Sequence, residues 1–407
     1  MRYNHLSTRL FLLALCIPFG CIDPGAQGAG TEIPQVFVLD GKHLAAVRER
    51  LKSNDARLEL AVGKLEKEAE AALGAGPFTI VDEFIPVSGN KHDYMSQAPY
   101  FWRNPNTPDG LPYIRRDGER NPEINKYPDH RLLDQMVDAV ETLALGYFFK
   151  GEEKYARKAA ELLWVWFLDP ATRMNPNLQH AQAIPGITSG RGIGIIESRG
   201  LTRVVDAIGL LAGSRSWTSH DQDGLQAWFR DYLQWLLESK NGRDEAAAKN
   251  NHGTYYDLQV MSFALFTGKK DLARQIASDA RQKRIATQIE PDGRQPLELA
   301  RTRAWSYSTG NLQGLMTLAR LAEHAGVDLW NFETADGRSL RQALEYLLPF
   351  GLGEKPWPHP QINGFSERAI HPLVRRAARK YSHARYEKIA ASLPSIEPDS
   401  RQILLQP

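Results

Sequence analysis

Cysteine is almost absent from this chain of 407 residues. The two that occur, Cys16 and Cys21, both lie within the first 21 residues. The rest of the chain therefore has no intramolecular disulfide bond, no thiol nucleophile and no cysteine ligand for zinc. The sequence is compatible with an oxidising compartment, although the chain would form no disulfide bond there.

Long apolar runs and an excess of charge of one sign are also missing. The apolar run Leu10–Ile17 is too short to span a bilayer. The net charge is +2, and residues 1–20 hold two arginines and no acidic residue, so the remainder has 50 − 2 = 48 basic and 48 acidic residues. This balance argues against a general nucleic-acid-binding protein but permits a local basic groove for a polyanionic sugar. The histidines form no His-x3-His or His-Glu-x2-His pair, so no metal or other cofactor is expected.

The first residues have the features of an export signal. Arg2 and Arg9 flank the start of the apolar run, and Gly20-Cys21 is typical of the site at which a bacterial lipoprotein is cut and acylated. We expect a signal peptide over 1–21, a Gly/Ala/Pro-rich linker over 22–33 and one domain over 34–407. Cleavage near Ala26–Ala29 without acylation is the alternative. The protein is thus expected in the periplasm or, with a lipid anchor at Cys21, on the outer membrane.

Apolar residues recur with helical spacing over most of the remaining chain. Two stretches, 76–128 and 169–200, interrupt this pattern, and no alternating series of strands is visible. Units of helix, short turn and helix surround Gly151 and Gly268, without the sustained period of about 34 residues of a tetratricopeptide array. We predict an all-α fold, an (α/α) toroid or incomplete α/α barrel of helical hairpins, with a cleft formed by the two irregular stretches. The helices are expected near 43–52, 54–74, 132–144, 153–168, 201–212, 219–239, 252–267, 269–286, 310–325, 338–349 and 371–392.

Two short motifs could carry chemistry in that cleft. Asn251 and His252 belong to an Asn-Asn-His run at the start of a helix, where asparagine is also a common N-cap. In the second motif, Tyr307 follows Arg301 by six residues, a spacing that does not place both on one helical face. An irregular turn around Trp305 would be needed to bring them together. Alternatively, the arginines of this motif face the solvent and its aromatic residues pack in the core.

Two longer segments have the composition of a sugar-binding surface. Segment 94–123 interleaves aromatic residues with arginines, and segment 175–191 is a Gly-rich loop with hydrogen-bonding side chains. Aromatic faces stack on sugar rings and guanidinium groups bind carboxylates, although a well-packed loop would have the same composition. The candidate substrate-binding residues are Tyr100, Trp102, Tyr113, Arg116, Gln179, His180, Arg191, Tyr255 and Arg303.

The order of these motifs resembles the alginate lyase superfamily of α/α-toroid polysaccharide lyases. The resemblance covers roughly residues 90–350 and rests on an Asp-Gly-Leu-Pro-Tyr region, an Asn-Pro-Asn-Leu loop, Asn-Asn-His, and an arginine with a tyrosine six residues on. Gly253-Thr254-Tyr255 follows the histidine where the compact periplasmic alginate lyases have an Arg-Tyr-Trp-like run. The chain is therefore more similar to the longer, broad-specificity polyuronate and glucuronan lyases.

The resemblance implies β-elimination on a uronic-acid polymer, which yields 4,5-unsaturated uronate ends. Removal of the C5 proton builds charge on the neighbouring carboxylate, and Asn251 and His252 would stabilise it. Tyr307 would act as the base, with Arg301 favouring its phenolate, and then as the acid. His252 is the alternative base when the proton and the leaving group lie on opposite faces. Arg303 competes with Arg301, because a helical spacing of four residues would place Arg303 beside Tyr307.

Two other functions remain open at this point. A glycoside hydrolase on the same fold would need a pair of carboxylates in the cleft, and no recognisable pair occurs. A non-catalytic glycan-binding surface lipoprotein would use the same aromatic residues and arginines without the Asn-His and Arg-Tyr motifs. The anionic polysaccharide is the expected partner in the lyase and binding interpretations.

Overall fold

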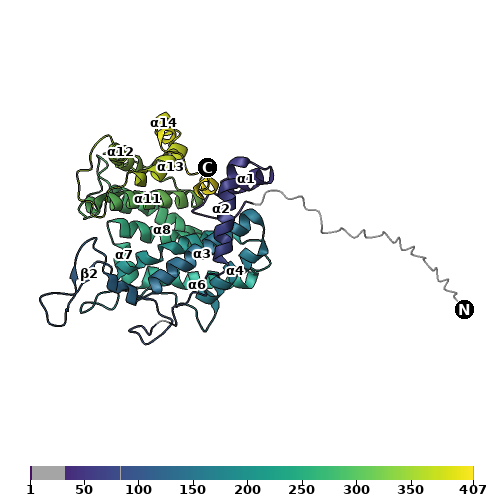
Figure 1. Cartoon of the computed structure of the whole chain (residues 1–407), viewed down its shortest axis with the longest axis horizontal. Coiled ribbons are helices and arrows are strands. Elements are labelled where there is room, and N and C mark those ends of the chain that lie inside the picture. Colours follow the sequence, from purple (N-terminus) through teal and green to yellow (C-terminus); the bar gives the residue numbers. More distant parts are fainter. Residues whose placement is uncertain (2–32, 83, 407) are drawn as a thin grey trace. The chain divides into compact units, whose positions relative to one another are not determined.

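Helices make up most of the computed structural model, which describes Met1 and residues 33–82 and 84–406 (Figure 1). The α-helices are α1 (Gly41–Lys52), α2 (Ala56–Ala72), α3 (Asp129–Lys150), α4 (Glu153–Leu163), α5 (Leu201–Leu210), α6 (Ser219–Glu238), α7 (Lys240–Ala246), α8 (Asn251–Phe266), α9 (Lys270–Ala280), α10 (Pro296–Leu299), α11 (Ala304–His324), α12 (Leu340–Gly351), α13 (His371–Tyr381), α14 (Ala384–Ser392) and α15 (Gln402–Leu405). The 3-10 and π turns are η1 (Pro122–Lys126), η2 (Trp164–Leu168), η3 (Gly192–Gly200), η4 (Arg281–Ala286) and η5 (Glu367–Ile370). The predicted all-α class is confirmed.

The predicted export signal, with Cys21, and the linker up to residue 32 lie outside the described residues. Their assignments therefore stay predictions. From Ile33 onward the chain forms one compact unit. Within the described residues, no helix combines the length and the apolar character needed to cross a membrane.

Helical hairpins are the building units of the α/α toroid, as the sequence predicts. α3 packs against α4, and the turn between them contains Gly151 at a φ of 72°. α8 packs against α9 after a turn in which Gly268 has a φ of 77°. Both turns need the left-handed region, which glycine enters without steric cost. The apolar stripe of α3 is buried against α2, α4 and α5.

α8 is the central helix of the unit and lies next to α11 (Figure 1). All but two of its residues are buried, so its polar side chains need partners inside the protein. The Gln259 amide, for example, accepts a hydrogen bond from Ser198 at 2.7 Å and donates to the Ile195 carbonyl at 3.3 Å. Residues Asn251 and His252 at its N-terminal end line the cavity, together with Asn250 just before the helix.

Four short strands lie in the two irregular stretches. β1 (Met95–Gln97) pairs in parallel with β4 (His180–Ala183), and β2 (Phe101–Trp102) pairs with antiparallel β3 (Ile114–Arg115). The β1–β4 pair joins a strand from each stretch, so the stretches form one loop layer at one end of the helices (Figure 1).

Several helices differ from those predicted. α11 begins at Ala304 rather than near 310, because the Gln361 side chain accepts hydrogen bonds from the first backbone N–H groups of the helix. The helix predicted over 371–392 is two helices, separated at Ser382, whose φ is 44°. α7 has only seven residues and was not predicted.

Candidate active site

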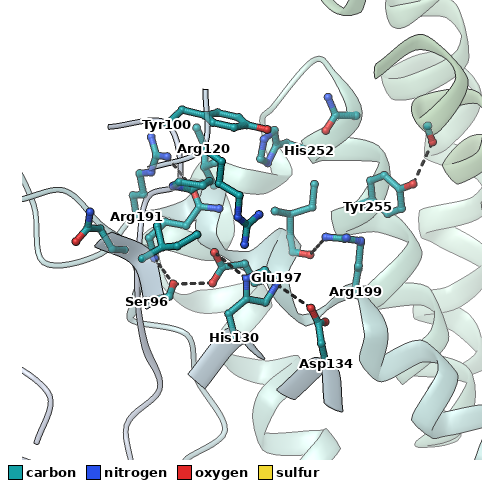
Figure 2. A pocket seen from close by; sticks show the side chains of 18 of the residues that line it. Ser96, Tyr100, Arg120, His130, Asp134, Arg191, Glu197, Arg199, His252 and Tyr255 are labelled. Atoms are coloured by element: carbon teal, nitrogen blue, oxygen red, sulfur yellow. Dashed lines mark hydrogen bonds and ion pairs between the residues drawn. The ribbon is translucent and has the colours of Figure 1, made fainter. Parts of the chain in front are cut away.

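A cavity of about 1070 Å³ opens between the loop layer and the ends of the helices. Both irregular stretches contribute to its wall, as predicted, together with α3, α8 and α11. Figure 2 shows Tyr100 and His252 on one side of this cavity and His130 with Asp134 on the other. The residues predicted from sequence that line it are Tyr100, Arg191, Asn251, His252, Tyr255, Arg301 and Tyr307.

The Asn-Asn-His motif forms the first turn of α8, and its two asparagines have different tasks. Asn250 is the N-cap, whose side chain accepts a hydrogen bond from the His252 backbone N–H at 3.3 Å. Asn251 donates from its backbone N–H and its amide to the two oxygens of Glu298, at 2.6 and 2.8 Å. Burial raises the pKa of Glu298, and the two bonds from Asn251 oppose this shift. Because Glu298 uses one amide hydrogen of Asn251, the other is available to a ligand.

His252 is held by a second buried glutamate. Its Nδ1 lies 2.8 Å from Oε1 of Glu245, a residue of α7 whose side chain is 1% exposed. A carboxylate at Nδ1 fixes the orientation of the ring and keeps a proton on that nitrogen. Nε2 then faces the cavity, where it can accept a proton when the ring is neutral or bind a carboxylate when the ring is charged.

A Glu245→Gln variant should show how much this carboxylate contributes. The amide fills the same space but removes the negative charge at Nδ1, so kcat should fall by about 10²-fold with little change in KM. Asp244→Asn is the matched control, since Asp244 is the neighbouring acid on α7 and pairs with Lys240 on the surface. Steady-state kinetics of both variants test this, and equal kcat values would contradict a role for Glu245.

The Arg-Tyr motif is brought together by a break in the helix rather than by a turn around Trp305. α10 ends at Leu299 and α11 begins at Ala304, so Trp305 is already helical. Arg301 lies in the non-helical link, where Asp117 accepts hydrogen bonds from its Nε at 3.0 Å and from its Nη2 at 2.8 Å. Burial opposes the charge of Asp117, but the bonds from Arg301 and Thr302 outweigh it and hold the pKa of this carboxyl below its usual range. Gly118, the residue after Asp117, has a φ of 77°. A Cβ at this position would lie 2.5 Å from the Thr302 hydroxyl, so the close approach of the two loops leaves no space for a side chain.

The Tyr307 hydroxyl is the meeting point of three side chains. It accepts a hydrogen bond from Arg301 Nη2 at 2.9 Å and donates one to the Tyr100 hydroxyl at 2.9 Å. The Arg301 guanidinium also lies 3.9 Å from the centre of the Tyr307 ring. Arg301, and not Arg303, is therefore beside Tyr307. Burial and the bond to Tyr100 raise the pKa of Tyr307, and the charge of Arg301 opposes them.

Two further residues of the predicted set have clear partners at the cavity wall. The Tyr255 hydroxyl donates to the Gly310 carbonyl at 3.0 Å, which joins α8 to α11. Arg191 donates to the Gln182 amide oxygen at 2.7 Å and lies over the Phe101 ring. Burial lowers the pKa of the Arg191 guanidinium to about 10. No carboxylate in the described part of the chain pairs with Arg191, so a cation faces the cavity without a counter-ion.

Trp102, Arg116 and Tyr113, also predicted to bind substrate, do not line this cavity. Arg116 lies over the ring of Trp102, whose indole N–H donates to the Glu119 carbonyl. Tyr113 belongs to a small core with Ala98 and Ile184, and its hydroxyl donates to Glu123 at 2.5 Å. Burial and this bond raise the pKa of Tyr113 to about 12. These aromatic residues and arginines bind each other within the loop.

Gln179, His180 and Arg303 also lie outside the cavity wall. Gln179 is exposed, and its carbonyl accepts a hydrogen bond from the Asn241 side chain. His180 is used in the β1–β4 pair, opposite Met95. Arg303 forms a β-bridge with Gln361 next to the start of α11.

Several residues at the cavity wall or directly behind it were not predicted. Glu245 and Glu298 hold the two motif residues of α8, and His130, Arg120 and Arg199 line the wall. The acidic residues of short helices and a lone helical histidine carry no motif, so the sequence offers no signal for them. Within the described residues, no group of three or more His, Cys, Asp or Glu side chains is arranged to hold a metal ion.

Comparison with known proteins identifies the family of the chain. The family model described as alginate lyase matches residues 78–357, more than half of the chain. An alginate lyase from Bacteroides ovatus is 40% identical in sequence, with a TM-score of 0.87 over 92% of this chain and 99% of that one. A variant of alginate lyase A1-III in complex with a tetrasaccharide is 17% identical, with a TM-score of 0.60 over 93% of this chain and 97% of that one, and shares the fold. No curated protein matches this chain. The chain belongs to the alginate lyase family.

Proposed function

We propose that this protein is a polysaccharide lyase that cleaves alginate and related polyuronates by β-elimination. The observation that carries this proposal is the Tyr307 hydroxyl, which lies between Arg301 and Tyr100 in the cavity that also holds Asn251 and His252. The family model and the Bacteroides ovatus structure, both described as alginate lyases, support the substrate class.

The arrangement supplies each group that the reaction needs. The amide of Asn251 and Nε2 of His252 would bind the uronate carboxylate and stabilise the charge that builds on it. A base then takes the C5 proton, the electron pair of the C–H bond forms the C4–C5 double bond, and the C4–O bond breaks. As a phenolate stabilised by Arg301, Tyr307 would take the proton, and the resulting phenol would then give a proton to the leaving oxygen and return to the phenolate.

The charge of the cavity wall also suits a polyanion. Six arginines line it against three acidic residues. In a chain whose overall charge is only +2, this excess is local and matches a polymer that carries carboxylates. A neutral polysaccharide would bring no negative charge to these guanidinium groups.

The test is an assay of the purified protein on poly-mannuronate, poly-guluronate and glucuronan. A lyase produces unsaturated ends that absorb ultraviolet light, and the initial rates on the three polymers rank their use. Saturated reducing ends would identify a hydrolase instead. Binding of the polymers without any new chain ends would identify a glycan-binding protein, and either result would overturn the proposal.

A further inference from the structure

A second histidine lies on the cavity wall across from His252. His130 belongs to the first turn of α3, and Figure 2 shows it between Glu197 and Asp134. Its Nδ1 lies 3.9 Å from Oε1 of Glu197, and its Nε2 lies 3.6 Å from Oδ2 of Asp134. The pair with Glu197 repeats the pattern of His252 with Glu245, in which Nδ1 of a cavity histidine faces a buried glutamate.

Neither carboxylate makes a hydrogen bond to the His130 ring. Both separations exceed the ~3.2 Å at which an N–H group bonds well to oxygen. Glu197 is 4% exposed and already accepts bonds at Oε2 from Tyr94 and Ser96, at 2.8 and 2.6 Å. Glu197 is thus fixed and orients the ring, while Asp134, with a side chain 60% exposed, can move away. The imidazole keeps hydrogen-bonding capacity for a ligand in the cavity.

The surroundings of His130 attract anions. Figure 2 shows Arg120, Arg191 and Arg199 around the His130–Glu197 pair. Within the described residues, none of these three guanidinium groups forms an ion pair with a carboxylate. Arg199, for example, donates only to the Ile196 carbonyl and lies over the Tyr255 ring. A carboxylate that entered this part of the cavity would meet positive charge on several sides.

We infer that His130 is the anion-recognising side chain of a subsite on the α3 wall, which binds the carboxylate of a uronate unit away from the cleaved bond. Asp134 would compete for this position, because its carboxylate lies 3.6 Å from Nε2. The inference rests on the proposed polyuronate substrate. It makes His130 a binding residue that affects KM, and Glu197 a positioning residue that acts through it.

Two substitutions with opposite expected effects test this inference. His130→Ala should raise the KM for poly-mannuronate about 10-fold, which corresponds to about 1.4 kcal/mol, and leave kcat within twofold of the wild type. Asp134→Asn should lower the KM about 3-fold, because it removes the group that competes for Nε2. Asp138→Asn is the matched control, since Asp138 lies one turn further along α3 and is already paired with Arg203 at 2.8 Å.

Equilibrium binding separates this inference from the proposed function. A mannuronate tetrasaccharide is titrated calorimetrically into the Tyr307→Phe protein with and without each substitution. Weaker binding with His130→Ala and tighter binding with Asp134→Asn alone support the subsite. Equal effects of Asp134→Asn and Asp138→Asn, or a fall in kcat with unchanged binding, overturn it. If the wild type forms no unsaturated product but His130→Ala still weakens binding, the lyase function fails and the subsite stands.

Discussion

A Tyr307→Phe variant should retain only about one thousandth of the wild-type kcat on polyuronate. The substitution removes one oxygen atom, which both accepts the hydrogen bond from Arg301 and donates the bond to Tyr100. The aromatic ring and its contact with the Arg301 guanidinium stay in place, so the KM and the circular dichroism spectrum should hardly change. The initial rate of ultraviolet absorbance measures the effect. A kcat within tenfold of the wild type would exclude Tyr307 as the base and leave His252 in that role.

Tyr100→Phe is the informative companion to that variant. The Tyr100 oxygen accepts a hydrogen bond from the Tyr307 hydroxyl, and this bond contributes to the raised pKa of Tyr307. A general base must be deprotonated to act, so the rate should rise with pH through the pKa of Tyr307. Removal of the bond lowers that pKa, and the rising limb of the pH–rate profile should move to lower pH. A profile that does not move would show that another group sets this limb.

The parts of the fold that depend on nearby residues could be predicted from the sequence. The hairpins around Gly151 and Gly268 follow from apolar periodicity and a glycine at the turn. The start of α11 could not be predicted, because its capping side chain, Gln361, lies 55 residues beyond Ser306 in the sequence. The break between α13 and α14 was missed because apolar periodicity continues across Ser382.

The candidate site was predictable where short motifs mark it. Asn251, His252, Arg301 and Tyr307 were all selected from sequence, and all four line one cavity. The choice between Arg301 and Arg303 depends on the non-helical link before Ala304, which local periodicity does not show.

The long loop was harder to interpret than the short motifs. Tyr113 and Trp102 belong to a segment that has the composition of a sugar-binding surface, yet their side chains contact residues of the same loop. Stacking on a sugar and stacking on a neighbouring arginine use the same side chains, so composition does not separate them. The buried glutamates behind the motifs look like ordinary helical surface residues until the helices are packed.

One buried ion pair connects the stability of the fold to the position of the site. Arg284, in η4, donates to both oxygens of Asp257 on α8, at 2.7 and 2.8 Å. It also donates to the carbonyls of Ala246 and Ala248, both at 2.8 Å, at the end of α7. These carbonyls come just before Asn250, so Arg284 fixes the chain from which the Asn-Asn-His motif starts. A Cβ on Gly253 would lie 2.4 Å from this guanidinium, which explains the glycine after His252.

An Arg284→Met variant should therefore lose about 3–5 kcal/mol of unfolding free energy, because Asp257 would remain buried without a counter-ion. Urea denaturation followed by circular dichroism measures the loss. Lys283→Met is the matched control, since Lys283 pairs with Asp279 on the surface and should cost about 1 kcal/mol or less. If Arg284→Met lost no more unfolding free energy than Lys283→Met, the buried ion pair would not be needed for stability.

The double variant Arg284→Met/Asp257→Leu separates the fold from the site. Apolar residues in place of both charges should restore most of the stability, because no unpaired charge is left in the interior. The carbonyls of Ala246 and Ala248 still lose their donor, so the start of α8 should be less firmly held. Recovered stability with a kcat about 10²-fold below the wild type would then assign to Arg284 the task of holding Asn251 and His252 in place. Recovery of both quantities would limit Arg284 to the packing of the core.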